Sequence, residues 1–151
     1  MGLLIAIIFG LVTATPGAHS QCDVNLIAKT LRHIEIADYE PSATSPPPAV
    51  VAELYSIAAR NVEHCASAAH HDMDSRIRDL LQAATFAKFA ASAYFVADDA
   101  QQGCSMLAEA ERDSAAADAL AASADSTDRR MLQASRPNEA SIRKLRASKC
   151  H

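Results

Sequence analysis

Large side chains and glycine are scarce in this sequence. It has no tryptophan, only 5% of its residues are aromatic, and it contains four glycines. The glycines form neither a phosphate-binding loop nor a dinucleotide fingerprint, and the sequence lacks a Gly-x-Ser-x-Gly elbow and a Cys-x-x-Cys pair. No stretch alternates apolar and polar residues with a period of two, which is the pattern of β-strands. We therefore expect an all-α protein, and the sequence indicates no cofactor and no catalytic machinery.

The stretch Leu80–Ala97 has apolar residues on more than one helical face and a single charge, Lys88. Three of the four phenylalanines of the chain lie in it. A helix that is apolar nearly all round belongs in the middle of a protein or in a membrane. Because Asp98 and Asp99 follow directly, and amphipathic segments flank the stretch, we expect a buried helix from Ser75 to about Asp98.

Two amphipathic helices are predicted before this core helix. Apolar residues at helical spacing define the first helix, Asp23–Asp38, which the proline-rich loop Tyr39–Pro48 ends. A second apolar stripe predicts a helix that Ser45 caps and that extends to about His70. The turn His71–Asp74 then leads into the core helix, with one of its two aspartates as the cap.

Two more helices are predicted after the core helix. Asp99, followed by Gln102, resembles a capping box and starts one helix. The other begins at Asp125 or Ser126, and Pro137 breaks or kinks it. The short turns make these helices antiparallel neighbours.

The N-terminus has the layout of a cleavable secretory signal peptide. A short apolar run from residue 3 to residue 12 is followed by Pro16 and by the small-x-small ending Ala18-His19-Ser20. The run is too short for an ordinary transmembrane helix. We therefore predict that residues 1–20 are removed, that residues 21–151 form a single domain, and that the protein is secreted or periplasmic, without a membrane span after cleavage.

Four cysteines lie in the predicted mature chain, and an even number in an exported protein favours two disulfides. A core helix of about 24 residues is ~36 Å long, so Cys65 and Cys104 would lie at opposite ends of the bundle. A disulfide needs Cα atoms within roughly 7 Å, which excludes that pair. Following the helices in turn places Cys22 near Cys65, and Cys104 near Cys150. We predict the disulfides Cys22–Cys65 and Cys104–Cys150.

Charge is unevenly distributed along the chain. Residues 21–128 contain 17 acidic and 7 basic residues, whereas the segment 129–151 contains 7 basic residues and 1 acidic residue. The basic segment either docks on the acidic body or reaches a phosphate or an anionic surface. It contains no aromatic residue on which bases would stack, so we expect no nucleic-acid partner.

Two candidate sites follow from local patterns. His70, His71, Asp72 and Asp74 place four possible metal donors within five residues, although the spacing matches no established site. The alternative is a solvated turn in which the aspartates cap a helix. A ligand cavity beside Phe86 and Phe89 is the second candidate.

One segment resembles a tetratricopeptide repeat hairpin. Ala91, Tyr94, Gly103, Leu107 and Ala110 match the offsets of its small, aromatic and alanine positions. The match covers about one repeat, 84–117, and does not continue on either side, whereas a repeat array needs about three units. The resemblance implies similar helical-hairpin packing and not a repeat array.

The sequence thus predicts an all-α, disulfide-stapled bundle of four to five antiparallel helices. Its function is predicted to be non-covalent: an exported protein-interaction, accessory or inhibitor module with an unknown protein partner. The alternative is an exported protein that binds a metal or a small ligand, at the His70–Asp74 turn or in an aromatic-lined cavity. The partner or ligand itself is not identified by the sequence.

Overall fold

The computed structural model describes residues 46–67, 72–123 and 126–151. This part of the chain contains four α-helices and no strand, which confirms the predicted all-α class. The predicted helix Asp23–Asp38 lies outside the described residues. The helices are α2 (Pro48–Ala66), α3 (Met73–Val96), α4 (Ala100–Ala121) and α5 (Ser126–Lys149).

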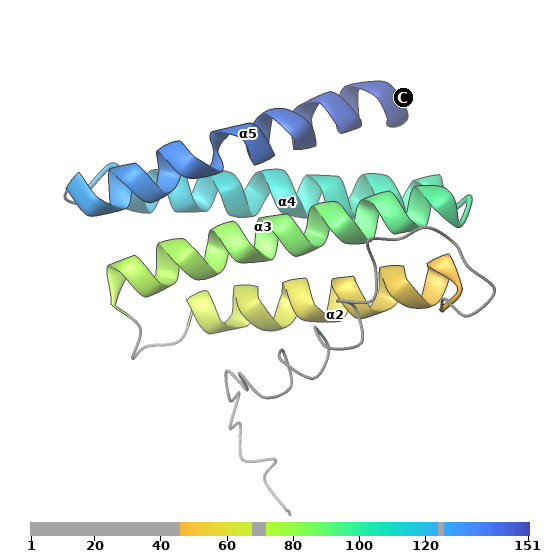
Figure 1. The fold of residues 1–151 in the computed structure, drawn as a ribbon, viewed down its shortest axis with the longest axis horizontal. Helices are drawn as coiled ribbons and strands as arrows, with labels where there is room; N and C mark the ends of the chain where they lie inside the picture. Colours follow the sequence, from red (N-terminus) through yellow and green to blue (C-terminus); the bar gives the residue numbers. More distant parts are fainter. Residues whose placement is uncertain (1–45, 68–71, 124–125) are drawn as a thin grey trace, which may run out of the picture.

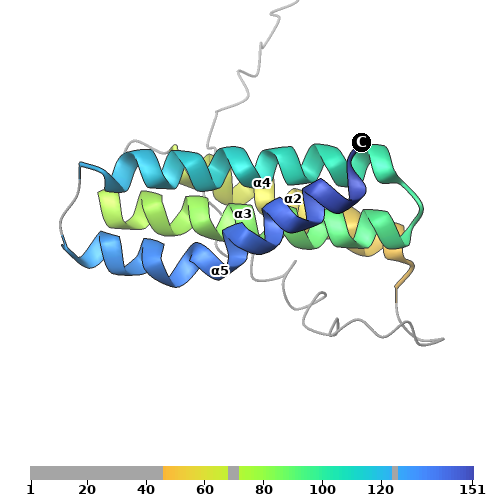
Figure 2. The same ribbon diagram turned by 90° about the horizontal axis from the view of Figure 1, so that it is seen from above.

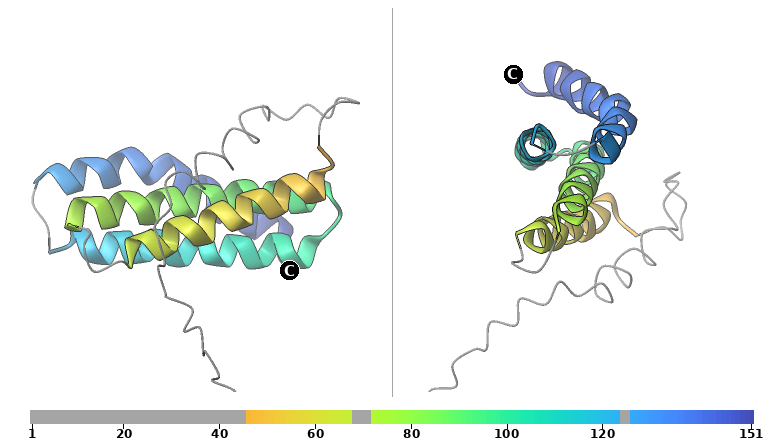
Figure 3. Two further views of the ribbon diagram at one scale, coloured as in Figure 1. Left: turned by 90° about the horizontal axis from the view of Figure 1, so that it is seen from below. Right: turned by 90° about the vertical axis from the view of Figure 1, so that its left-hand side faces the viewer.

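The central element is α3, which packs against α2 and α4 (Figure 1). Helix α5 contacts both α4 and α3, and it runs obliquely from the side of α3 towards the beginning of α4 (Figure 2). Viewed along the helices, α2 and α5 lie on opposite sides of α3 (Figure 3). The colours of Figure 1 show that each helix returns in the direction opposite to the one before it. None of the helices in the described ranges is both long enough and apolar enough to cross a membrane.

Alanine makes this close packing possible. Helix α3 buries eight residues, and five of them are alanines. A methyl side chain lets neighbouring helices approach closely, but each one buries little apolar area. The larger core side chains include Ile77, Met106 and Leu107, each no more than 1% exposed. The expectation of a buried helix is wrong at Phe89, which is 40% exposed and lies beside Tyr55.

Side-chain caps start two of the helices as predicted. Asp72 Oδ1 accepts a hydrogen bond from Ser75 N at 2.7 Å, and Asp99 Oδ1 accepts one from Gln102 N at 3.0 Å. The expected start of α2 is wrong, because the helix begins at Pro48 without a side-chain cap. A proline in the first turn needs no hydrogen bond for its nitrogen, so the helix starts after the proline run. The predicted cap, Ser45, lies outside the described residues.

A tight connection joins α3 to α4. Asp98 takes a left-handed backbone conformation with φ of 59°. One turn into α4, Gly103 lies directly against the ring of Phe95, and a Cβ atom built there would be 2.6 Å from the ring carbon Cε1. The absence of a side chain at Gly103 therefore allows Phe95 to pack between the two helices.

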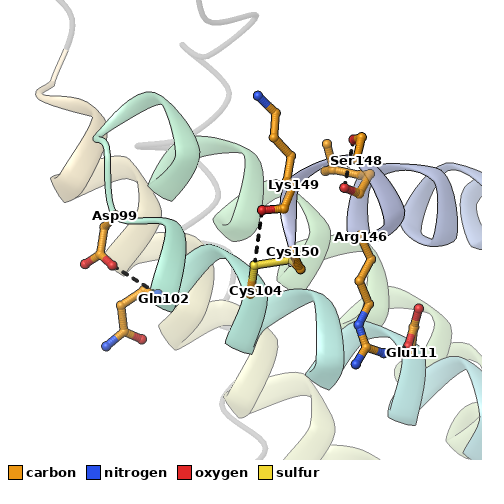
Figure 4. Close-up of a disulfide and its surroundings, with 9 residues drawn as sticks. Asp99, Gln102, Cys104, Glu111, Arg146, Ser148, Lys149 and Cys150 are labelled. Carbon is orange, nitrogen blue, oxygen red and sulfur yellow. Dashed lines mark hydrogen bonds and ion pairs between the residues drawn. A yellow bond between two sulfur atoms is a disulfide. The ribbon is translucent and has the colours of Figure 1, made fainter.

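Helix α5 is polar, and a disulfide and ion pairs connect it to α4. Few of its side chains reach the core: Ile142 is 1% exposed and Leu132 is 8% exposed. The predicted disulfide between Cys104 and Cys150 is present, and it bonds the residue after α5 to the N-terminal part of α4 (Figure 4). Cys65 is also disulfide-bonded, but its predicted partner, Cys22, lies outside the described residues.

Lys88 belongs to a cluster of polar side chains between α3 and α5. The Lys88 ammonium donates to Asn138 Oδ1 at 2.8 Å, and the Asn138 amide donates to Thr85 Oγ1 at 3.2 Å, so one polar cluster joins α3 to α5. Partial burial lowers the pKa of Lys88.

Pro137 lies inside α5 and does not end it, and the helix changes direction near its middle (Figure 2).

Candidate functional site

The predicted metal-binding residues are only partly described. His70 and His71 lie outside the described residues, whereas Asp72 is the N-cap of α3 and Asp74 lies in its first turn. One carboxylate oxygen of Asp72 is already bonded to the backbone of Ser75. The described part of the chain holds no group of three or more His, Cys, Asp or Glu side chains that could bind a metal ion. A metal site at this turn stays a prediction.

The predicted aromatic site is a packing cluster between α2 and α3. The ring of Tyr55 lies 6.3 Å from Phe86 and 5.4 Å from Phe89, measured between centroids. Lys88 Nζ lies 5.5 Å from the Phe89 centroid, within range of a cation–π contact. Phe86 is buried, so this cluster contributes to the core. The cleft described next is lined by none of these aromatic residues.

An open cleft of about 280 Å³ lies between α4 and α5. From α4 it is lined by residues spaced three and four apart: Glu111, Ser114, Ala115 and Asp118. From α5 it is lined by Glu139, Ile142 and Arg143, with the same spacing. This spacing places each set on one face of its helix, so the two helices direct one polar stripe each towards the cleft.

Ser114 is the unusual residue in the wall of the cleft. It is 7% exposed, and its buried Oγ has no hydrogen-bond partner among the described residues. A buried hydroxyl without a partner costs about 1–3 kcal/mol. Ser56 shows the ordinary arrangement: it is 1% exposed, and its Oγ donates to the Ala52 carbonyl at 3.0 Å. The contrast identifies Ser114 as a residue whose hydroxyl makes no hydrogen bond to the described part of the chain.

Glu139 is a charged residue that is only 5% exposed. Its Oε2 accepts from Arg136 Nη1 at 2.8 Å, and its Oε1 accepts from Ser135 Oγ at 3.3 Å. The same hydrogen bond to Glu139 raises the pKa of Arg136. Buried carboxylates need partners of this kind, so both oxygens of Glu139 are already engaged within α5.

Two arginines of α5, Arg136 and Arg146, connect this helix to acidic residues of α4. Both Nη atoms of Arg136 lie 3.3 Å from oxygens of Asp118, and Arg146 pairs with Glu111. The basic segment therefore docks on the acidic body through these pairs. Arg143 differs from them: its guanidinium makes no hydrogen bond to a described residue, lies 3.9 Å from Glu139, and belongs to a side chain that is 66% exposed.

Sequence reasoning found the charges but not the cleft. Glu139 is the only acidic residue of the basic segment, and arginines stand three before it and four after it. That spacing was a usable signal for an ion-pair cluster. Ser114 gave no signal, because its significance depends on a missing hydrogen bond. Comparisons with protein-family models, curated proteins and solved structures found nothing that matches this chain.

Proposed function

We propose that this protein is a small exported module that acts by non-covalent binding, and that the α4–α5 cleft is its binding site. Export rests on the signal-peptide pattern of residues 1–20. The observation that supports the site is Ser114, whose buried hydroxyl has no partner among the described residues and which lines an open cleft beside the buried charge of Glu139. A group that bonds to this hydroxyl on entering the cleft would remove its desolvation penalty.

The size of the cleft indicates what enters it. A volume of about 280 Å³ is at the small end for a ligand pocket, so the cleft has room for one small chemical group. We propose that a protein partner inserts one polar side chain or chain terminus, and the remaining contact spreads over α4 and α5. The alternative is a free small molecule in the same cleft.

We also propose that α3 and α4 pack as an antiparallel hairpin similar to a single tetratricopeptide repeat. The close approach of Gly103 to Phe95 supports this. Tyr94 contributes as well, since its hydroxyl lies 3.5 Å from Ser56 Oγ and donates to Glu53 Oε2 at 3.1 Å. In this arrangement α2, α3 and α4 are the scaffold and α5 completes the binding cleft.

The test is an NMR titration of the ¹⁵N-labelled protein with butyrate, butyramide, butylammonium and glucose. Binding at the cleft would shift the amide signals of residues 111–118 and 139–143 with at least one probe. Ala115→Trp, which fills the cleft from an exposed position, would reduce that shift. The matched control Ala49→Trp, on the exposed surface of α2, would leave it unchanged. If no probe shifts these signals, the proposed binding site is wrong.

A further inference from the structure

We propose that the α4–α5 cleft binds a carboxylate group, with Arg143 and Ser114 as its hydrogen-bond donors. The inference rests on the proposed function and specifies the chemistry of what the site takes.

The acceptors of the cleft are almost all engaged. Both oxygens of Asp118 lie 3.3 Å from Arg136, and both oxygens of Glu139 accept hydrogen bonds within α5. Glu111 uses Oε2 for Arg146. A ligand rich in donors, such as an ammonium group, would have to compete with these arginines for the carboxylates.

The two donors of the cleft make no hydrogen bond to a described residue, although Arg143 lies 3.9 Å from Glu139. Arg143 carries five N–H donors and no acceptor, and none of them is hydrogen-bonded to a described residue. Ser114 adds an unpartnered hydroxyl from the opposite helix. An incoming group must therefore accept hydrogen bonds from both sides of the cleft. A planar carboxylate matches the fork of a guanidinium and has a lone pair left for a hydroxyl.

The charges of the site distinguish a carboxylate from a phosphate. The three carboxylates of the lining are balanced by three arginines, 136, 143 and 146, each within 4 Å of one of them. A singly charged anion on Arg143 disturbs this balance by one charge. A phosphate with close to two charges would meet stronger repulsion from Glu111, Asp118 and Glu139. Ile142 and Ala115 offer apolar contact to the carbon next to a carboxylate.

The same chemistry has two possible sources. A free organic acid presents a carboxylate directly, and a protein partner presents one as an acidic side chain. The test therefore uses butyrate with its neutral analogue butyramide, and the blocked peptide acetyl-Ala-Ala-Glu-amide with its glutamine analogue. Inorganic phosphate is the third arm, and affinities are taken from the NMR shifts of the cleft amides at pH 7.

We expect each carboxylate probe to bind at least about tenfold more tightly than its amide analogue, because a charge-assisted hydrogen bond is lost with the charge. Arg143→Gln should weaken carboxylate binding by about tenfold or more, and Ser114→Ala by about three- to tenfold. The exposed Arg78→Gln and Ser105→Ala are matched controls outside the cleft and should change nothing. The tighter of the two carboxylate probes identifies the source.

Several results would overturn the inference. They are equal binding of acid and amide, tighter binding of phosphate, or an Arg143→Gln variant with unchanged affinity. If the cleft amides respond only to butylammonium, butyramide or glucose, the carboxylate assignment fails while the binding site stands. If they respond to no probe, both fail. Arg143 is exposed and Ser114 has no partner to lose, so both variants should keep the fold, which far-ultraviolet circular dichroism verifies.

Discussion

The Cα atoms of Cys104 and Cys150 lie 5.7 Å apart and are joined through a disulfide, so the end of the chain is tied to the N-terminal part of α4. The two residues are separated by 46 positions in the sequence. The bond closes a loop that contains both helices of the candidate cleft. Helix α5 depends on this closure because it places few large apolar side chains in the core.

Removing this disulfide should loosen α5. We expect Cys104→Ser with Cys150→Ser to lower the free energy of unfolding by about 2–4 kcal/mol, measured by urea denaturation without reductant. Protease cleavage within residues 126–149 should increase before cleavage in α2 or α3, because the local unfolding of α5 becomes easier. Unchanged stability together with unchanged protection of α5 would show that its ion pairs hold the helix alone.

Replacing a buried serine with alanine should change the stability in a direction that depends on whether its hydroxyl is hydrogen-bonded. Ser114→Ala should raise the free energy of unfolding by about 1 kcal/mol, since a desolvated hydroxyl without a partner is removed. Ser56→Ala should lower it by about 1 kcal/mol, since Ser56 Oγ has the Ala52 carbonyl as its partner. Urea denaturation measures both changes.

Exposed Ser105→Ala gives the part of these changes that comes from helix propensity, which is a few tenths of a kcal/mol. A Ser114→Ala variant that is less stable than the Ser105→Ala variant would contradict an unpartnered hydroxyl at residue 114. It would also remove the observation on which the proposed binding site depends.

Gly103 should be intolerant of even a methyl group. A Cβ atom there would lie 2.6 Å from the Phe95 ring, so Gly103→Ala must displace that ring or separate α3 from α4. We expect a net loss of about 1 kcal/mol, because overpacking costs about 1–3 kcal/mol and the better helix propensity of alanine returns up to about 1 kcal/mol. Thermal and urea denaturation measure it.

The double variant provides the control. In a Phe95→Ala background the clash is absent, so Gly103→Ala should become neutral or stabilising. If Gly103→Ala stabilises the protein with Phe95 present, the ring moves aside without cost. The close contact between Gly103 and Phe95 then contributes nothing measurable to stability.

Much of the fold could be predicted because it depends on local patterns. Helical spacing of apolar residues gave four of the helices to within a few residues, and the caps Asp72 and Asp99 follow from backbone donors that any helix start leaves open. The Cys104–Cys150 disulfide followed from the length of α3 together with the alternating direction of the predicted helices. Its counterpart, Cys22–Cys65, stays a prediction, and peptide mapping of the unreduced protein would test it.

The candidate site could not be predicted because it depends on contacts between helices. Ser114 is one serine among many in the sequence, and only the packing of the helices shows that its hydroxyl is buried without a partner among the described residues. The burial of Phe89 could not be predicted for a related reason. Spacing assigns a residue to a face of a helix, but the neighbouring helices determine how much of that face is covered. Asp113 is a further case: the carboxyl group is only 3% exposed, and its burial depends on the neighbouring helices.

Asp113 should make the protein less stable as the pH rises from about 4 to about 6. Burial raises the pKa of this carboxyl from 3.8 to about 6, the charges of Glu63 and Glu109 add to the rise, and Arg112 opposes it. Between these pH values the folded state binds more protons than the unfolded state. The free energy of unfolding therefore falls with increasing pH and stays low above the folded-state pKa.

Asp113→Asn should remove this dependence. At pH 7 the variant should be more stable by about 1–3 kcal/mol, because a buried ionised carboxylate is replaced by a neutral amide. Arg112 keeps its hydrogen bond to Glu63 at 3.0 Å in the variant. The control is Asp98→Asn, which also removes one negative charge but at an exposed position. Asn is suited to this position because it tolerates the left-handed backbone conformation of residue 98. Urea denaturation at pH 4, 5, 6 and 7, roughly spanning the two pKa values, distinguishes the cases. A less stable Asp113→Asn protein at pH 7 would mean that attraction to Arg112 outweighs the burial of the charge.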